Sequence, residues 1–200
     1  FLWSLDMVDV LTSCNVALKE WAVTIRAMAL GRQILIVRKG GIHQDDKEFR
    51  IIHPNFLLFP TYEHQKLDLL KSSVQQDPIT PLEHASDDNE IHFNYWSRVT
   101  DIYELRDSAT LSKISPFHHW TDDYVKSRFH WRPSQPLTLA LLRLFKLEEE
   151  TSVPLTPEFS GCKSWVELDQ DIPVVGAQAV LSDDEYNQKA TLIREALAGA

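Results

Sequence analysis

Cysteine is nearly absent from this chain of 200 residues, which contains only Cys14 and Cys162. Two cysteines are too few for a disulfide framework or a four-cysteine zinc site, and they are typical of proteins from a reducing compartment. We therefore expect two unpaired thiols and a cytoplasmic location. Lys163 follows Cys162 and would lower the pKa of that thiol, but no base is identified beside it, so a cysteine nucleophile is not expected.

Long apolar runs are absent too. No segment approaches the roughly 20 apolar residues that a membrane-spanning helix needs. Residues 1–6 carry neither the basic region nor the small residues of a signal peptide. We therefore expect no membrane partner. Because Met7 is a candidate for the true start of the protein, residues 1–16 are expected to form an N-terminal extension and residues 17–197 a single globular domain.

Basic residues are in deficit, since 20 Lys and Arg face 29 Asp and Glu and the formal net charge is -9. Non-specific electrostatic binding of duplex DNA by the whole molecule is therefore not expected. A local basic patch is compatible with this net charge. Aromatic residues, in contrast, are plentiful, with six Trp, nine Phe and five Tyr. Each can bury on the order of 150–250 Å², so together they can supply much of a hydrophobic core.

Motifs that dictate a reaction are missing as well. The chain has no P-loop, no dinucleotide-binding glycine pattern and no Gly-x-Ser-x-Gly elbow. No pair of histidines has metal-ligand spacing, so we assign no metal site and leave any cofactor unknown. The carboxylates considered as acid–base groups include no pair with diagnostic spacing; they are Glu20, Glu48, Asp101 and Glu104.

Periodicity and capping residues predict an α+β fold, in which helices flank a mixed, largely antiparallel sheet that is either open or closed into a barrel. Helices are expected at residues 17–30, 62–72, 107–114, 121–129 and 182–197. A strand through Trp21, Val23 and Ile25 is the alternative to the first helix. Strands are expected at residues 33–37, 49–53, 56–59, 93–105, 137–147 and 163–168, the first two as a hairpin, with a surface loop at residues 75–90.

Short segments along the whole chain share residues with a known family. They are Lys19-Glu20-Trp21-Ala22-Val23, Gly31-Arg32-Gln33, Arg38-Lys39-Gly40-Gly41-Ile42, Phe59-Pro60-Thr61, His64-Gln65, Pro116-Phe117-His118, Trp120-Thr121 and Gly161-Cys162-Lys163-Ser164-Trp165. With them the chain resembles the domain-of-unknown-function 1802 family (DUF1802) of bacteria, cyanobacteria in particular, and archaea, over about residues 17–197. The resemblance implies no established activity, substrate or cofactor. His119 departs from it, because an apolar residue is expected at that position.

Two short polar segments are candidate ligand sites. Arg38, Lys39, Gly40 and Gly41 put two cations at a strand end where glycines let a ligand approach the backbone, which suits a phosphate or carboxylate. A plain cationic hairpin turn is the alternative. His64-Gln65 is expected in the first turn of a helix, where free N–H groups bind anions and the imidazole stays neutral. Packing or capping of the helix end is the alternative there.

The densest cluster of polar and aromatic residues lies between residues 118 and 132. Arg128 and Trp131 are three residues apart, which allows cation–π contact or a stacked base near Trp120. A purely structural cluster is the alternative. Metal binding by His118 and His119 is not expected, because adjacent side chains point apart on a helix or a strand.

These residues favour binding or processing of a phosphate-bearing ligand, a nucleotide or single-stranded nucleic acid. Arg38, Lys39 and Arg128 would hold the anion, and Trp120 or Trp131 would stack a base. His64 and His118 would act as polar readers or acid–base groups. The alternatives are a non-catalytic protein–protein interaction or scaffold protein, with a protein partner on the Trp and Arg residues, and a metal-dependent hydrolase.

Overall fold

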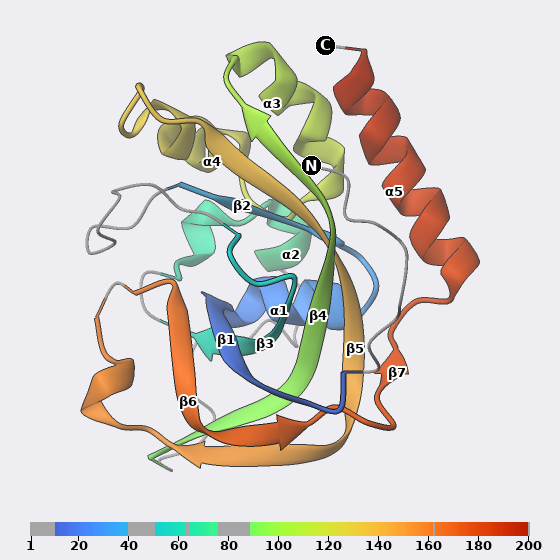
Figure 1. Ribbon diagram of the computed structural model, residues 1–200. Coiled ribbons are helices and arrows are strands. Elements are labelled where there is room, and N and C mark those ends of the chain that lie inside the picture. Colours follow the sequence, from blue (N-terminus) through green and yellow to red (C-terminus); the bar gives the residue numbers. More distant parts are fainter. Residues whose placement is uncertain (1–10, 40–50, 63–64, 76–88, 162, 200) are drawn as a thin grey trace.

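Seven strands form one sheet in the part of the chain that the computed structural model describes, residues 11–39, 51–62, 65–75, 89–161 and 163–199 (Figure 1). The strands are β1 (Ser13–Trp21), β2 (Leu35–Arg38), β3 (Asn55–Thr61), β4 (Glu90–Leu105), β5 (Leu137–Pro154), β6 (Trp165–Pro173) and β7 (Gln178–Ala179). Their order is β2-β5-β4-β3-β1-β6, and β7 pairs with β5. β1 and β3 are parallel, whereas the other pairs are antiparallel. The expected α+β fold with a mixed, largely antiparallel sheet is confirmed, and the sheet is open rather than closed into a barrel.

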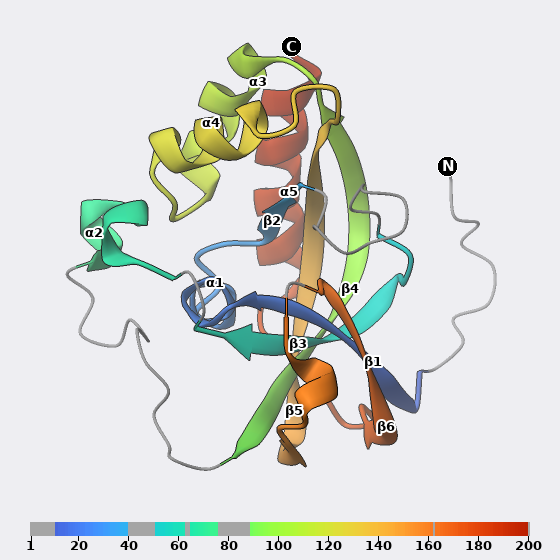
Figure 2. The same cartoon turned by 90° about the vertical axis from the view of Figure 1, so that its left-hand side faces the viewer.

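Five α-helices accompany this sheet in the described residues. They are α1 (Ala22–Ala29), α2 (Ser72–Gln75), α3 (Ser108–Ile114), α4 (Asp122–His130) and α5 (Asp183–Ala198), with single 3-10 turns at Leu67–Leu69, Ser115–Phe117 and Pro157–Phe159. α3, α4 and α5 gather at one end of the long strands β4 and β5 (Figures 1 and 2). None of the described helices has the length and apolarity to cross a membrane.

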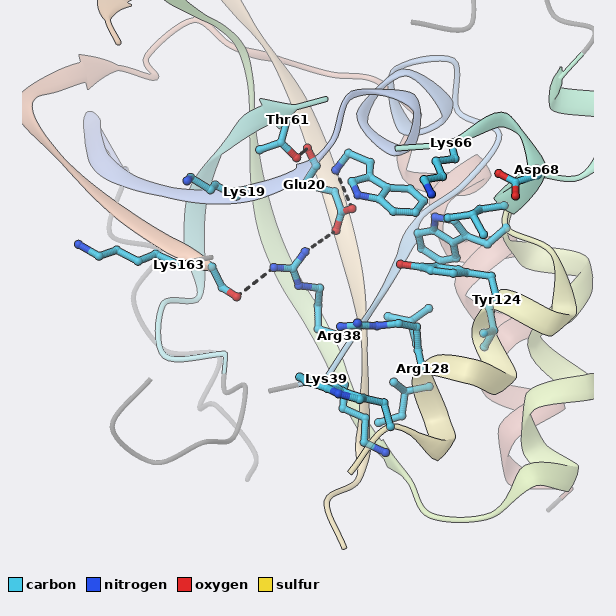
Figure 3. Close-up of a pocket in the computed structure, with 18 of the residues that line it drawn as sticks. Lys19, Glu20, Arg38, Lys39, Thr61, Lys66, Asp68, Tyr124, Arg128 and Lys163 are labelled. Carbon is cyan, nitrogen blue, oxygen red and sulfur yellow. Dashed lines mark hydrogen bonds and ion pairs between the residues drawn. The ribbon is translucent and has the colours of Figure 1, made fainter. Parts of the chain in front are cut away.

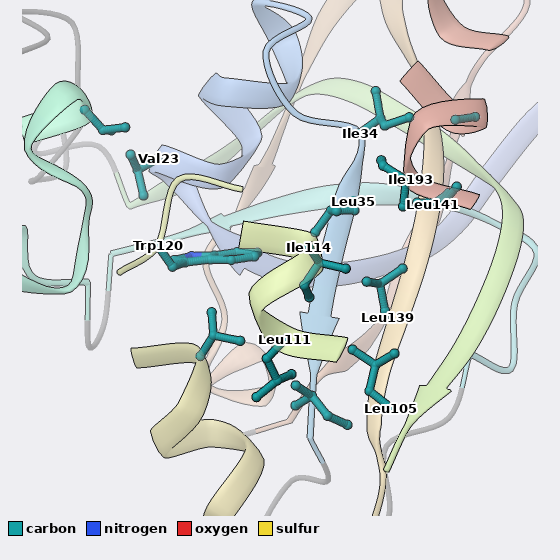
Figure 4. Close-up of a cluster of buried hydrophobic side chains, with 14 of the residues drawn as sticks. Val23, Ile34, Leu35, Leu105, Leu111, Ile114, Trp120, Leu139, Leu141 and Ile193 are labelled. Atoms are coloured by element: carbon teal, nitrogen blue, oxygen red, sulfur yellow. The ribbon is translucent and has the colours of Figure 1, made fainter. Parts of the chain in front are cut away.

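A hydrophobic cluster fastens α3, α4 and α5 to the sheet (Figure 4). Leu111 and Ile114 of α3 and Ile193 of α5 are buried against β5, whose Leu139 and Leu141 are fully buried. Burial of a Leu or Ile side chain contributes on the order of 1.5–3 kcal/mol. This cluster therefore fixes the helical layer, and with it the position of α4 beside the strand ends.

Curvature of the sheet brings its two outer strands together. β4 shifts register against β5 between Phe93 and Tyr95 and again between Val99 and Asp101, and such bulges bend and twist a strand. A second buried cluster collects side chains of β1, β2, β3 and β5. At one rim of the curved sheet, the Arg38 Nη2 at the end of β2 donates to the Ser164 Oγ just before β6, over 3.0 Å.

The predicted helix at residues 17–30 is wrong in its first part. Residues through Trp21 form β1, and α1 begins only at Ala22. Ala17 and Leu18 are both completely buried, because β1 lies between β3 and β6 and is covered on both faces. Backbone pairing with two neighbours thus outweighs a local helical pattern. The alternative strand is right as far as Trp21 but wrong for Val23 and Ile25, which are helical.

Two further predictions for this half of the chain are wrong. The strand expected at residues 49–53 is absent from its described part, residues 51–53, and β2 pairs with β5 rather than with a hairpin partner. The helix expected at residues 62–72 is also wrong for the described part of that range: Tyr62, Gln65 and Lys66 are not helical, Leu67–Leu69 form a single 3-10 turn, and α2 begins only at Ser72. Thr61 is the last residue of β3 instead of a helix cap, and its Oγ1 donates to the Glu20 carbonyl over 3.2 Å.

Elements with strong end signals are confirmed. Thr121 caps α4 by accepting from the Tyr124 N–H, and Ser182 with Glu185 forms a complete capping box on α5. Gly31 takes a left-handed φ of 66° just after α1, as predicted for a helix end. The strands at residues 33–37, 56–59, 93–105, 137–147 and 163–168 correspond to β2, β3, β4, β5 and β6. The surface loop expected at residues 75–90 lies almost entirely outside the described residues.

Candidate functional site

A pocket of about 530 Å³ lies where β1, β2 and β3 end, between α4 and the segment that precedes β6 (Figure 3). This volume is within the 300–1,000 Å³ typical of small-molecule sites. The lining residues are Lys19, Glu20, Trp21, Val37, Arg38, Lys39, Thr61, Lys66, Asp68, Leu69, Trp120, Tyr124, Val125, Arg128, Trp131, Leu137, Gly161, Lys163 and Ser164. The curved sheet and the helical layer therefore enclose one concave site.

The lining is strongly cationic. Six of its residues are basic and two are acidic, so it has a formal excess of four positive charges, whereas the whole chain has a net charge of -9. The acidic residues are Glu20 and Asp68; the basic residues are Lys19, Arg38, Lys39, Lys66, Arg128 and Lys163. A concave wall of one sign concentrates ligands of the opposite sign. The pocket is therefore suited to an anion.

A buried ion pair occupies the centre of the lining. Arg38 Nη1 lies 3.4 Å from Glu20 Oε2, and the Trp21 N–H donates to Glu20 Oε1 over 2.8 Å. The buried Thr24 hydroxyl is also near this carboxylate and favours its ionised form. Burial raises the pKa of Glu20, while the Arg38 guanidinium opposes that shift. Since Nη2 of Arg38 donates to Ser164, this side chain is held at both ends of its guanidinium and positioned in the lining.

Lys39 and Arg128 form a cationic corner beside this pair. The Lys39 Nζ donates to the Phe129 carbonyl and lies 5.2 Å from the centre of the Phe129 ring. Burial, together with the neighbouring Arg128, lowers the pKa of Lys39. The Arg128 guanidinium lies 4.9 Å from the Trp131 ring and makes no ion pair with any described residue. Neither cation of this corner forms an ion pair within the described residues.

Basic side chains also stand on the opposite side of the pocket. Lys19 of β1 donates to the Phe159 carbonyl and, over 3.1 Å, to the Gly161 carbonyl. Lys163 is exposed, and so is Lys66 near the 3-10 turn at Leu67–Leu69. Neither Lys66 nor Lys163 forms an ion pair within the described residues. Figure 3 shows Lys19 and Lys163 on one side of Arg38 and Tyr124 on the other.

An aromatic wall completes the site. The Trp21 and Tyr124 rings stack with their centres 5.1 Å apart and their planes 29° apart. Trp120 is 4% exposed and belongs to both the lining and the hydrophobic cluster under the helices. Burial raises the pKa of Tyr124, so its hydroxyl is protonated at neutral pH. Flat apolar rings beside a cationic surface suit a ligand that combines an aromatic base with a phosphate.

The structure brings together half of the residues that the sequence singled out. Arg38, Lys39, Trp120, Arg128 and Trp131 all line the pocket. The remaining candidates fall outside the lining or outside the described residues; the former are Gln65 and His118, the latter Gly40, Gly41 and His64.

His118 and Gln65 have structural contacts. The His118 ring is buried, with Nδ1 3.1 Å from the Trp120 carbonyl and Nε2 without a hydrogen-bond partner. Burial lowers its pKa to about 4. Gln65 Oε1 accepts from the Val23 N–H over 3.0 Å, near the start of α1. Neither contact places a polar atom in the pocket lining, because both side chains satisfy the backbone nearby.

Several lining residues were missed from the sequence. The sequence marks Glu20 only as an acid–base candidate and does not single out Lys19, Trp21, Tyr124 or Lys163 for this site. Segments 19–23 and 161–165, which carry the family resemblance, contain all of these residues except Tyr124. The misassigned helix at residues 17–30 concealed the first segment, because a helix would have spread these side chains around its axis.

The other acid–base candidates have no shared site. Asp101 accepts from Arg194 Nε and Nη2, both over 2.8 Å, which contributes to a lowered carboxyl pKa despite the opposing effect of burial. Glu104 pairs with Arg106 over 2.7 Å on the surface. Glu48 lies outside the described residues. In the described part of the chain, no three His, Cys, Asp or Glu side chains are grouped so that they could hold a metal ion.

Comparison with known proteins gives a family match and distant structural likenesses. The family model for a domain of unknown function, DUF1802, matches residues 17–191. No curated protein matches the chain. The crystal structure of ASCH from Zymomonas mobilis is similar at 12% identity and a TM-score of 0.43, covering 88% of this chain and 92% of that one. The crystal structure of a serine-to-alanine mutant of ZmASCH from the same organism is similar at 11% identity and a TM-score of 0.45. The match covers 91% of this chain and 99% of that one. With identities and TM-scores this low, function has to be inferred from the pocket itself.

Proposed function

The chain belongs to the domain-of-unknown-function 1802 family, and from the chemistry of its pocket we propose that it binds a phosphate-bearing ligand, a nucleotide or a segment of single-stranded nucleic acid. The family carries no activity with it, so the proposal depends on the residues of this chain. One observation carries it: a concave lining with four excess positive charges and stacked aromatic rings, in a molecule whose net charge is -9.

The charge distribution favours an anionic ligand at this one place. Arg128, Lys66 and Lys163 have no carboxylate partner among the described residues, so their charges remain available to a phosphate. Hydrogen bonds to charged groups contribute about 1.5–3 kcal/mol each. Because the rest of the surface is acidic on balance, a rigid duplex would meet repulsion outside the pocket, whereas a mononucleotide or a flexible single strand would not.

The cations divide between fixed and available groups. Arg38 is held by Glu20 and Ser164 and serves to shape the lining. Arg128 on α4 and Lys163 in the segment before β6 are the groups proposed to contact phosphate. Trp21 and Tyr124 supply the apolar surface on which a base would stack, a contact that contributes about 1–3 kcal/mol per base.

The experiment that tests this function is a fluorescence-anisotropy titration of the purified protein with labelled single-stranded pentanucleotides, alongside calorimetric titration with nucleoside 5′-monophosphates. Arg128→Ala and Lys163→Ala are each expected to weaken binding about tenfold, since each removes one charge-assisted contact. Lys126→Ala is the matched control, because Lys126 is an exposed cation on the same helix as Arg128 but does not line the pocket. Arg38→Ala is a poorer probe, because it would leave the buried Glu20 without its cation.

Three outcomes separate the alternatives. Comparable binding of monophosphates and pentanucleotides would identify a nucleotide site, whereas binding of pentanucleotides alone would identify a strand-binding site. If neither binds at 100 μM protein, the proposal is wrong, and a capture experiment for a protein partner follows. Unchanged binding in both Arg128→Ala and Lys163→Ala would place any observed binding elsewhere on the molecule.

A further inference from the structure

A buried carboxylate is unexpected in the wall of an anion-binding pocket. Glu20 is 4% exposed and lines the same space as the six basic residues. Removing a carboxylate from water costs several kcal/mol, and its charge also repels a phosphate nearby. Its long contact with Arg38 helps to position that side chain, but a phosphate-binding role of the pocket does not by itself require a carboxylate here. Figure 3 shows its carboxylate facing the space between Arg38 and Tyr124.

The hydrogen bonds of Glu20 leave acceptor capacity unused. Oε1 accepts one N–H, from Trp21 over 2.8 Å, and Oε2 has one long contact of 3.4 Å with Arg38. An ionised carboxylate has about four acceptor positions. Each oxygen therefore retains a lone pair. Burial raises the pKa of Glu20, whereas the Arg38 charge and the Trp21 N–H oppose that shift and favour the ionised form.

Aromatic rings lie directly beside this carboxylate. Trp21 is the next residue in the chain, and its ring stacks on Tyr124. The Glu20 charge is close enough to Tyr124 to raise the pKa of that phenol, in addition to the larger effect of burial. A planar base that extends this stack would present its polar edge, rather than its face, toward the two carboxylate oxygens.

We propose that Glu20 is a specificity-determining residue that selects guanine in the ligand, an inference that rests on the proposed binding of a nucleotide or single strand. Guanine carries two neighbouring donors on its Watson–Crick edge, N1–H and the N2 amino group, which match two carboxylate oxygens. Adenine and cytosine place an acceptor nitrogen beside their amino group, and uracil has one N–H between two carbonyls. Among these four bases, only guanine can donate a hydrogen bond to each oxygen of an ionised carboxylate without placing an acceptor atom of the base opposite one of those oxygens.

The test uses five RNA pentanucleotides that differ at the central position of a uridine background: guanine, hypoxanthine (inosine), adenine, cytosine or uracil. Inosine lacks only the N2 amino group, so it removes one of the two predicted hydrogen bonds. We expect the guanine pentamer to bind wild-type protein about tenfold or more tightly than the inosine pentamer, because loss of a charge-assisted hydrogen bond costs at least about a factor of ten. The adenine, cytosine and uracil pentamers should bind more weakly than the guanine pentamer by at least this factor.

Glu20→Gln provides the second arm. The amide keeps the shape of the side chain but replaces one acceptor oxygen with a donor, so the preference for guanine over inosine should fall to less than about threefold. The dependence of binding on salt should persist, because the phosphate contacts remain. Glu104→Gln is the control, because Glu104 is an exposed carboxylate outside the lining. This variant should leave the preference for guanine unchanged.

The outcomes keep the two proposals apart. If wild-type protein binds the pentamers but does not distinguish guanine from inosine, selection by Glu20 is wrong while the binding function stands. If neither the pentamers nor the nucleoside 5′-monophosphates bind, the binding function itself fails. Should Glu20→Gln unfold, which its circular dichroism would reveal, the guanine–inosine comparison on wild-type protein still decides the matter.

Discussion

At the scale of single residues, His118 is the group whose ionisation the fold suppresses. Its ring is buried, its Nε2 has no hydrogen-bond partner among the residues that the structure describes, and burial together with the nearby Lys71 lowers its pKa from 6.5 to about 4. On acidification, His118 therefore becomes protonated near pH 6.5 in the unfolded chain but only near pH 4 in the folded chain. Stability should be fully present above pH 6.5, and about 3 kcal/mol of it should be lost as the pH falls to 4.

Chemical denaturation at a series of pH values measures this effect, with His118→Asn as the reference. Asparagine can still donate to the Trp120 carbonyl but does not titrate. Other carboxylates titrate in the same range, so the difference between the two proteins is the relevant quantity. The variant should lose about 3 kcal/mol less than wild-type between pH 6.5 and 4. Parallel curves for the two proteins would show that His118 accepts its proton normally in the folded state.

At the scale of elements, α5 depends on its first turn as well as on its buried face. Ser182 Oγ accepts from the Glu185 N–H over 3.3 Å, and Glu185 Oε2 accepts from the Ser182 N–H over 2.9 Å. Tyr186, Ala190 and Ile193 are the residues it buries. We expect Ser182→Ala to lower the free energy of unfolding by about 1 kcal/mol, because the helix start loses its side-chain acceptor.

Urea denaturation measures this loss, and Ser182→Asp is the matched control. Aspartate restores an acceptor at the same position and favours the positive end of the helix dipole, so its stability should lie within a few tenths of a kcal/mol of wild-type. Binding at the pocket should be the same in all three proteins, because α5 contributes no lining residue. If Ser182→Ala and Ser182→Asp lose equal stability, the cap is not what the serine supplies.

At the scale of the whole molecule, positive charge is concentrated at one pocket although the net charge of the chain is negative. An acidic chain of net charge -9 concentrates six basic side chains around one pocket. Affinity for a pentanucleotide should therefore fall as salt rises, with a slope of log affinity against log salt of about -0.7 for each phosphate neutralised. Lys163→Ala should make that slope shallower by about 0.7, since one phosphate contact is lost.

Anisotropy titrations between low and physiological salt give these slopes. Lys126→Ala, which removes the same charge from the surface outside the pocket, should leave the slope unchanged. Equal changes in both variants would show that the ligand senses only the overall charge of the molecule. A slope near zero for wild-type protein would show that the pentanucleotide is held without phosphate contacts.

Elements whose signal lies within a few consecutive residues were predictable. The capped helices α4 and α5 carry their start signals in Thr121 and in Ser182 with Glu185, and Gly31 marks the end of α1. The long strands β4 and β5 carry theirs in extended apolar and alternating runs. In each case the determining contacts are local, so the sequence contains them without knowledge of the fold.

The sequence by itself thus determined the fold class, the family resemblance and five residues of the pocket. Tertiary structure alone decided that residues 13–21 form a strand, because that segment is stabilised by β3 and β6, which are distant in the sequence. It likewise decided that Lys19, Glu20 and Trp21 line the same pocket as Arg38 and that His118 is buried outside its lining. A pocket made by five separated segments arises from the curvature of the sheet, and that curvature depends on pairings between distant residues, which no local pattern records.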